Sequence, residues 1–168
     1  MGFIKRSSII GAALTLALAG ATQAYAVEDT KLSNIAQNCA TIKRSLTQLQ
    51  RADSRTRAYL GTSYETIANN FITPLNVRLI KNNQPDSTIF TIQSEFTEMH
   101  ARFRTEYTDY MRELEGLIGV NCQNNPQGFY DRLEATRNHR AALQNVVVRL
   151  GELIQEQDKA VAKLREGI

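Results

Sequence analysis

Residues 89–117 read IFTIQSEFTEMHARFRTEYTDYMRELEGL, and this stretch decides the fold. Its large apolar side chains recur every three or four positions, which places them on one face of a helix with 3.6 residues per turn. They are Ile89, Ile92, Phe96, Met99, Phe103, Tyr107, Tyr110, Leu114 and Leu117. One neighbouring helix would not cover so broad an aromatic face, so we expect the central helix of a small bundle.

A second helical pattern precedes this stretch. Its apolar positions, again three or four residues apart, are Leu32, Ile35, Cys39, Ile42, Leu46 and Leu49, and then Leu60, Tyr64, Ile67, Phe71, Leu75 and Leu79. Gly61 precedes a sequence that resembles a capping box, and Pro74 is typical of a first helical position, so each favours a break. Because the apolar stripe continues through both points, we expect one long helix over about 30–81, bent or interrupted near Gly61 and Pro74.

Turn sequences divide the rest of the chain. KNNQPD at 81–86 ends the first helix, Asp86 or Ser87 can cap the second, and CQNNP at 122–126 precedes the third, with Asn125 as its cap. Three-four spacing resumes after Pro126, and no alternating strand pattern occurs. The sequence therefore predicts an all-α fold, an elongated antiparallel three-helix bundle of coiled-coil type, with helices at about 30–81, 87–118 and 126–166 in one domain, 27–168.

The first 26 residues have the features of a secretory signal peptide. Lys5 and Arg6 precede an apolar run over 7–20, and Ala24-Tyr25-Ala26 supplies the small residues that signal peptidase reads. The alternative is an uncleaved membrane anchor, for which the run is short. We expect cleavage after Ala26, no stable membrane anchor afterwards, and a periplasmic or extracellular location.

Charge and cysteine content constrain the exported chain further. The full chain has 20 Lys and Arg, and removal of Lys5 and Arg6 with the signal peptide leaves 18 against 17 Asp and Glu. The net charge of the exported chain is then close to zero, so nucleic acid is not an expected partner. Cys39 and Cys122 are the two cysteines. An even pair in an exported chain favours a disulfide, and the alternatives of CxxC redox chemistry and haem attachment do not fit the spacing.

The register of the bundle predicts a polar layer. When the first and third helices are aligned at Cys39 and Pro126, Asp53 and Arg140 each lie 14 residues farther along their helices. Both occupy positions at which the three-four spacing predicts apolar residues. We expect these two side chains to approach each other, with Glu106 of the central helix near the same level. Such a layer often specifies register while adding little stability. A functional polar pocket beside His139 is the alternative.

A basic group lies on the first helix. Arg44, Arg51 and Arg55 are seven and four residues apart and share one helix face. One interpretation is contact with an acidic surface such as anionic lipid or an envelope polymer. The other is a solvated face that acidic residues of the neighbouring helices balance.

Catalytic and cofactor motifs are not found in the sequence. Its two histidines, His100 and His139, do not form a metal-binding pair, and no nucleophile with a base, phosphate loop or paired metal carboxylates can be assembled. We therefore expect no enzymatic activity, no cofactor and no metal. Met99-His100 superficially suits a haem ligand, but haem needs an axial pair from separate helices.

These observations favour an exported, non-enzymatic helical bundle with a structural or protein-interaction role, acting through a protein partner or self-association. In length, signal peptide and helix content the chain is similar to small exported helical chaperones of the bacterial envelope, and that resemblance implies the first alternative, a holdase that binds unfolded clients along an apolar groove. It implies no site residues, because no motif carries it. The second alternative, a carrier of a small ligand or cofactor, requires a cavity between the helices.

Overall fold

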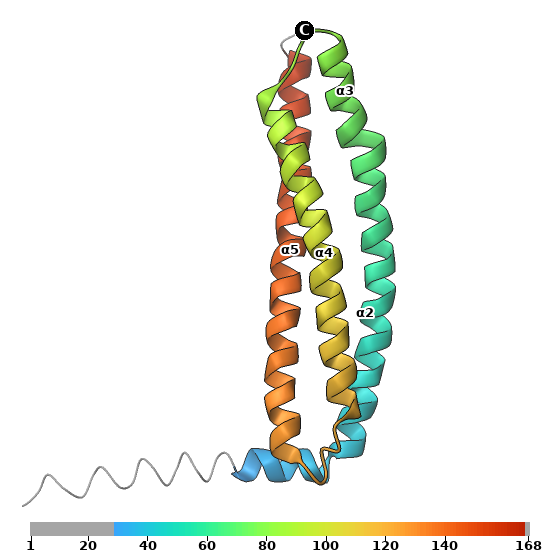
Figure 1. The fold of residues 1–168 in the computed structure, drawn as a ribbon, viewed down its shortest axis with the longest axis vertical. Helices are drawn as coiled ribbons and strands as arrows, with labels where there is room; N and C mark the ends of the chain where they lie inside the picture. The colour runs from blue at the N-terminus through green and yellow to red at the C-terminus, as the bar shows by residue number, and fades with distance from the viewer. Residues whose placement is uncertain (1–28, 167–168) are drawn as a thin grey trace, which may run out of the picture.

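The computed structural model describes residues 29–166, and all of its regular structure is helical (Figure 1). The labelled elements are α2 (Cys39–Ile67), a π-helical segment η1 (Ala68–Ile72), α3 (Thr73–Lys81), α4 (Ser87–Gly119) and α5 (Pro126–Glu166). The molecule is elongated, with α2, η1 and α3 in succession along one side and α4 and α5 beside them. The prediction of an all-α fold is confirmed. The predicted signal peptide lies outside the described residues.

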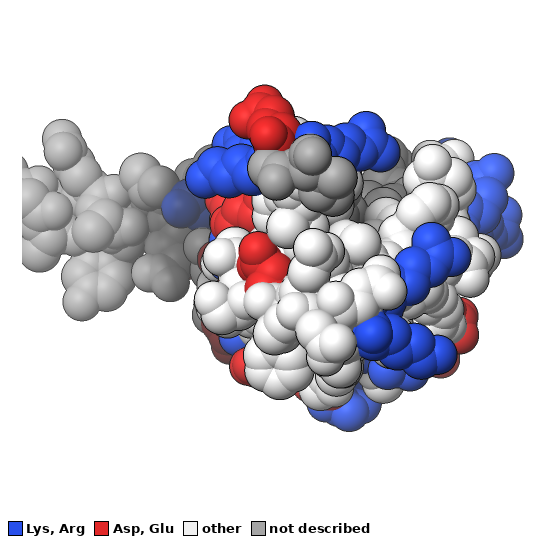
Figure 2. All heavy atoms as spheres, turned by 90° about the horizontal axis from the view of Figure 1, so that it is seen from above, with Lys and Arg blue, Asp and Glu red and all other residues white. Residues whose placement is uncertain are grey.

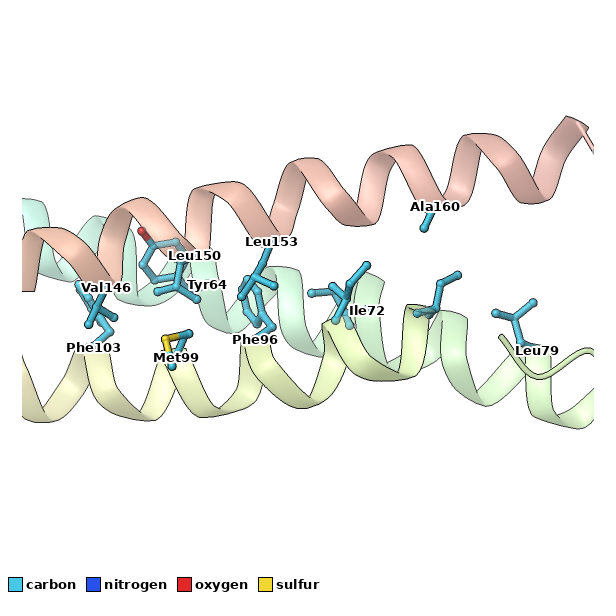
Figure 3. Close-up of a cluster of buried hydrophobic side chains, with 12 residues drawn as sticks. Tyr64, Ile72, Leu79, Phe96, Met99, Phe103, Val146, Leu150, Leu153 and Ala160 are labelled. Atoms are coloured by element: carbon cyan, nitrogen blue, oxygen red, sulfur yellow. The ribbon is translucent and has the colours of Figure 1, made fainter. Parts of the chain in front are cut away.

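The apolar face of α4 forms the centre of the core. All nine of its predicted core positions are buried, and Phe96, Phe103 and Tyr110 are no more than 2% exposed. Figure 3 shows side chains of α2, α4 and α5 pointing toward one another, among them Tyr64 of α2, Phe96 of α4 and Leu153 of α5. The ring of Tyr64 packs edge-on against Phe103 at a centroid distance of 5.3 Å. Burial of this aromatic face is the main force that assembles the helices.

The helices are not equally well packed. α4 and α5 contact each other along most of their length, whereas α2 contacts mainly α4. Over its 29 residues α2 buries only Tyr64 fully. A polar link adds to the α4–α5 pair, because Arg149 of α5 donates to both carboxylate oxygens of Glu95 at 2.7 and 2.8 Å and lowers the pKa of that carboxyl group. α2 is therefore the most weakly held of the long helices.

The turns use the capping residues that the sequence indicates. The side chain of Asp86 accepts a hydrogen bond from the backbone N–H of Ile89, and that of Asn125 accepts one from the N–H of Gly128, both at 3.0 Å. Before α4, Asn83 takes a φ of 54°, a left-handed conformation that asparagine tolerates. These local signals explain why the bounds of α4 and α5 lie close to the predicted ones.

The first helical segment differs from the prediction of one helix over 30–81. Residues 29–37 are helical, but the chain turns at Asn38 and these residues lie across the end of the molecule rather than along it (Figure 1). α2 passes through Gly61 without a break, so the helix is not interrupted there. The break near Pro74 is present and takes the form of η1, where the N–H of Thr73 bonds to the carbonyl of Ala68, five residues earlier.

The π-helical segment changes which residues face the core. One extra residue in the turn moves the apolar stripe by one position, so Ile72 is 1% exposed and Phe71 is 64% exposed. The sequence pattern had assigned Phe71 to the core and left Ile72 outside it. Pro74, which has no N–H to donate, lies two residues after the end of this segment, and a segment that already departs from the α-helical ladder accommodates it.

The two cysteines join opposite sides of one end of the molecule. Their sulfur atoms lie 1.97 Å apart, so Cys39 at the start of α2 is at disulfide distance from Cys122 in the turn before α5. Cys122 belongs to a second buried cluster with Tyr110, Leu114, Leu117 and Phe129. The bridge holds the start of α2 against the end of the α4–α5 pair.

Candidate functional site: a cleft between α2, α4 and α5

A polar cluster joins the three long helices α2, α4 and α5. Oδ2 of Asp53 on α2 accepts a 2.6 Å hydrogen bond from the hydroxyl of Tyr110 on α4. The guanidinium of Arg140 on α5 lies 3.6 Å from the same oxygen. The Asp53 side chain is 20% exposed and that of Arg140 is 54% exposed, so solvent screens this ion pair and its net contribution to stability is small.

The cluster contains a residue that the sequence prediction does not include. The structure brings together Asp53 and Arg140, and Tyr110 joins them through its hydrogen bond to Asp53. No hydrogen bond or salt bridge in the described chain joins Glu106 to Asp53 or Arg140, so the expected place of Glu106 near this level stays a prediction. The ring of Tyr110 fits the apolar pattern of α4, so the sequence pattern does not indicate a polar role for this residue. Burial, and then its hydrogen bond to Asp53, raise the pKa of Tyr110, whereas the charge of Arg140 opposes the shift.

The cluster lies at the edge of a cleft of about 300 Å³ between the three helices. Its apolar wall consists of Leu60, Phe103, Leu143 and Val147. The polar lining consists of Asp53, Thr56, Arg57, Tyr107, Tyr110, Arg140 and Gln144. An apolar hollow with a few polar groups at one side is the usual form of a small-molecule site, and the space between bundle helices is one of its usual places.

Arg57 and Tyr107 form one side of the cleft. The Arg57 guanidinium carbon lies 4.8 Å from the centroid of the Tyr107 ring, a cation–π arrangement, and the Tyr107 hydroxyl contacts Oγ of Ser54 at 3.4 Å. With Asp53 and Arg140, the charged residues that line the cleft carry one net positive charge. The cleft is therefore suited to an apolar group that ends in an anion.

A second hollow of about 430 Å³ lies farther along, between η1, α3 and α5. Gln157 of α5 is among its lining residues and is 7% exposed. Its Oε1 atom is buried and accepts no hydrogen bond from any described residue. On the other side of the core, Asn76 donates to Gln93, and Gln93 donates to Thr73. Sequence periodicity does not indicate that Asn76, which is 6% exposed, is buried.

The remaining candidates lie outside the cleft. Arg44, Arg51 and Arg55 are exposed on α2 and form no salt bridge within residues 29–166. The ring of His100 packs edge-on against Tyr64, and burial, followed by the charge of Arg104, lowers its pKa. Among the described residues no three His, Cys, Asp or Glu side chains are grouped so as to hold a metal ion.

Within the part of the chain that the structure describes, no helix combines the length and the apolar character needed to cross a membrane. No protein-family model matches the chain, and no curated protein or solved structure is significantly similar to it. A function for the cleft is therefore inferred from the geometry of the cleft itself.

Proposed function

We propose that the protein is an exported, non-enzymatic binding protein that holds a small amphipathic anion in the cleft between α2, α4 and α5. In this proposal the chain is an antiparallel three-helix bundle whose first arm is divided into α2, η1 and α3. The signal peptide pattern and the cysteine pair support export. The observation that carries the proposal is the cleft of about 300 Å³, with apolar walls and one excess positive charge.

The chemistry of the cleft specifies the ligand class. Leu60, Leu143 and Val147 offer an apolar surface that favours an aliphatic or aromatic group, because burial of such a group removes apolar area from water. Arg57 and Arg140 can each donate paired N–H groups to a carboxylate. Since Asp53 already neutralises part of this charge, a monoanion is favoured over a dianion.

Decanoate is a suitable probe, and isothermal titration calorimetry measures its binding to the mature chain. We expect one site per chain, and weaker binding of decylammonium, which has the same alkyl chain and the opposite charge. Leu143→Trp places a large ring in the cleft and should abolish binding. The matched control is Val148→Trp, because Val148 is 52% exposed and does not line the cleft.

Two results would contradict the carrier proposal. One is the absence of saturable decanoate binding to the folded, disulfide-bonded chain. The other is equal loss of binding in Leu143→Trp and Val148→Trp, which would place the ligand elsewhere. Circular dichroism of each variant distinguishes a blocked cleft from a failure to fold.

A second candidate is the protein-interaction role, for which the end of the molecule at the α3–α4 turn supplies the evidence. Viewed from that end, most of the surface at the centre is uncharged, with an acidic group among it and basic side chains around it (Figure 2). Ile80 of α3 and Phe90 of α4 are 56% and 61% exposed on either side of the turn. A largely uncharged end permits a second copy to approach with little charge repulsion, so self-association is the interaction it favours.

Sedimentation equilibrium tests self-association directly. An Ile80→Glu/Phe90→Glu variant should remain monomeric at concentrations at which the parent chain dimerises, and a parent chain that is monomeric at millimolar concentration would exclude this candidate. The holdase alternative requires a continuous apolar groove. Phe71 and Val77, on η1 and α3, extend the exposed apolar residues from this end, whereas Tyr59 and Val148 lie farther away on α2 and α5.

A further inference from the structure

The outer face of α2 carries a row of basic side chains. Arg44, Arg51, Arg55 and Tyr59 follow one another at steps of seven, four and four residues, so they share one side of the helix. Tyr64, the buried residue of α2, lies about half a turn away from this row. The row therefore faces directly away from the core.

The side chains of this row are available to a partner. All three arginines are exposed, and Tyr59 is 72% exposed. Within the described residues no carboxylate pairs with these arginines, and the one hydrogen bond from their side chains runs from Nε of Arg55 to the backbone carbonyl of Arg51, at 3.4 Å. Arg149 on α5, in contrast, is held by three glutamates. Neighbouring acidic residues do not balance the α2 face.

Positive charge is concentrated on this helix. α2 contains five Lys and Arg against two Asp and Glu, whereas α4 contains three Arg against six Asp and Glu. In the end view, basic side chains project on the side of the molecule where α2 and α3 lie (Figure 2). The chain, whose formal net charge is +3, thus concentrates positive charge along α2, and an anionic partner would meet it on that side.

The form of the row indicates what kind of anionic partner fits. The α-carbons of Arg44 and Arg55 are about 17 Å apart along the helix axis, and the helix runs straight between them. A straight, convex row of guanidinium groups matches a flat array of phosphates. Tyr59 continues the row, and tyrosine is enriched where proteins meet the membrane–water interface.

We propose that the outer face of α2, formed by Arg44, Arg51, Arg55 and Tyr59, binds the phosphate headgroups of an anionic membrane surface. The protein then lies along the surface through α2, with no segment of α2 inserted into the hydrocarbon. This inference goes beyond the carrier proposal and does not depend on it, because the row and the cleft are on opposite faces of α2.

Vesicle sedimentation tests the proposal with the disulfide-bonded mature chain. Vesicles of phosphatidylcholine with 30% phosphatidylglycerol are compared with vesicles of phosphatidylcholine alone. We expect binding to the anionic vesicles only, and its loss at about 0.5 M salt, where electrostatic attraction is screened within a few ångströms. An Arg44→Gln/Arg51→Gln/Arg55→Gln variant should bind on the order of 100-fold more weakly.

A matched control removes the same charge from other faces. Arg102 on α4 and Lys159 and Lys163 on α5 are exposed and form no salt bridge with a described residue. The Arg102→Gln/Lys159→Gln/Lys163→Gln variant should keep most of the binding, because its α2 face is intact. Tyr59→Ser should weaken binding severalfold without changing the salt dependence.

Three outcomes would overturn the proposal. They are equal binding to neutral and anionic vesicles, equal loss in the two triple variants, and binding to soluble poly-glutamate with none to vesicles. The last result would assign the face to an acidic polypeptide instead. Decanoate binding, measured on the same variants, should be unchanged, so failure of this proposal is distinguishable from failure of the carrier proposal.

Discussion

The hydroxyl of Tyr110 donates a 2.6 Å hydrogen bond to Oδ2 of Asp53 and so ties α4 to α2 at a level where α2 has few buried contacts. Tyr110 is 1% exposed, so water cannot easily replace its hydroxyl if it is removed. We expect Tyr110→Phe to lower the free energy of unfolding by about 1.5–3 kcal/mol, the usual range for a hydrogen bond to a charged group. Urea denaturation measures this difference.

Tyr59→Phe is the matched control for that change. The Tyr59 side chain is 72% exposed and no described residue accepts a hydrogen bond from it, so the free energy of unfolding should change by less than about 0.5 kcal/mol. Equal stability of Tyr110→Phe and the parent chain would show that the Asp53 carboxylate is adequately solvated without its partner.

The cysteine pair should make a large contribution to stability. Cys39 and Cys122 are 83 residues apart, and closing a loop of that length stabilises the folded state by about 4.5 kcal/mol on the chain-entropy model. We expect a Cys39→Ser/Cys122→Ser variant to unfold at a much lower urea concentration than the oxidised parent. Dithiothreitol should destabilise the parent and leave the variant unchanged. A difference below about 1 kcal/mol would contradict the prediction.

Local signals in the sequence are sufficient to predict the bounds of α4 and α5 and the buried face of α4. The nine apolar positions of α4 and the capping residues Asp86 and Asn125 depend on neighbours within one or two turns, and the structure has them as the pattern indicates. The proximity of Asp53 and Arg140, at 3.6 Å, follows from the equal rise per residue of helices that run side by side.

Other features depend on more than local pattern. The apolar residues around 64–79 fit a core face both with and without one extra residue in the turn, so the spacing could not distinguish Phe71 from Ile72 as the buried one. The cleft arises because α2 packs less closely than α5 against α4, which is a property of the assembled molecule. The polar role of Tyr110 was hidden because its ring satisfies the apolar pattern.

Gly61 offers a simple way to stabilise α2. It lies inside a continuous helix, and a Cβ atom there would have Phe103 as its nearest neighbour, at 4.0 Å, an ordinary contact. Because alanine has a higher helix propensity than glycine, Gly61→Ala should raise the free energy of unfolding by about 0.5–1 kcal/mol. Thermal denaturation would show a correspondingly higher Tm, and a lower Tm would indicate that α2 needs a bend at this position.

Gly128 provides the opposite case. A Cβ atom at this position would clash with the side chain of Asn125, which caps α5 through its hydrogen bond to the N–H of Gly128. Loss of a cap costs about 0.5–2 kcal/mol, which offsets the gain in helix propensity. We therefore expect Gly128→Ala to be no more stable than the parent, in contrast to Gly61→Ala.

His100 should make stability depend on pH. Burial and the charge of Arg104 lower its pKa below the ordinary value of 6.5, and Glu65 opposes this shift. The unfolded chain therefore takes up the proton at a higher pH than the folded chain does. As the pH falls through about 6.5 toward the lower folded-state pKa, the free energy of unfolding decreases. We expect His100→Gln to lose less stability than the parent between pH 7.5 and 5.5.

Proton NMR of the His100 ring checks the cause of that difference. Its titration midpoint in the folded chain should lie below 6.5, and the pH at which the parent begins to lose stability relative to His100→Gln should lie near the unfolded-state value. Parallel stability curves for the two proteins across this range would refute the assignment.

Replacement of Gln157 by an apolar residue should stabilise the protein. It is 7% exposed, and its Oε1 atom accepts no hydrogen bond from any described residue, so folding strips water from that oxygen without compensation. Gln157→Leu has a similar volume, removes the uncompensated polar atom and adds apolar contact to α5. We expect the free energy of unfolding to rise by about 1–2 kcal/mol. Gln155→Leu, at an exposed position of the same helix, should change it by less than about 0.5 kcal/mol. Urea denaturation of the two variants measures these differences. If Gln157→Leu is less stable than the parent, the replacement has displaced a partner of the amide, such as bound water or a ligand in the adjoining hollow.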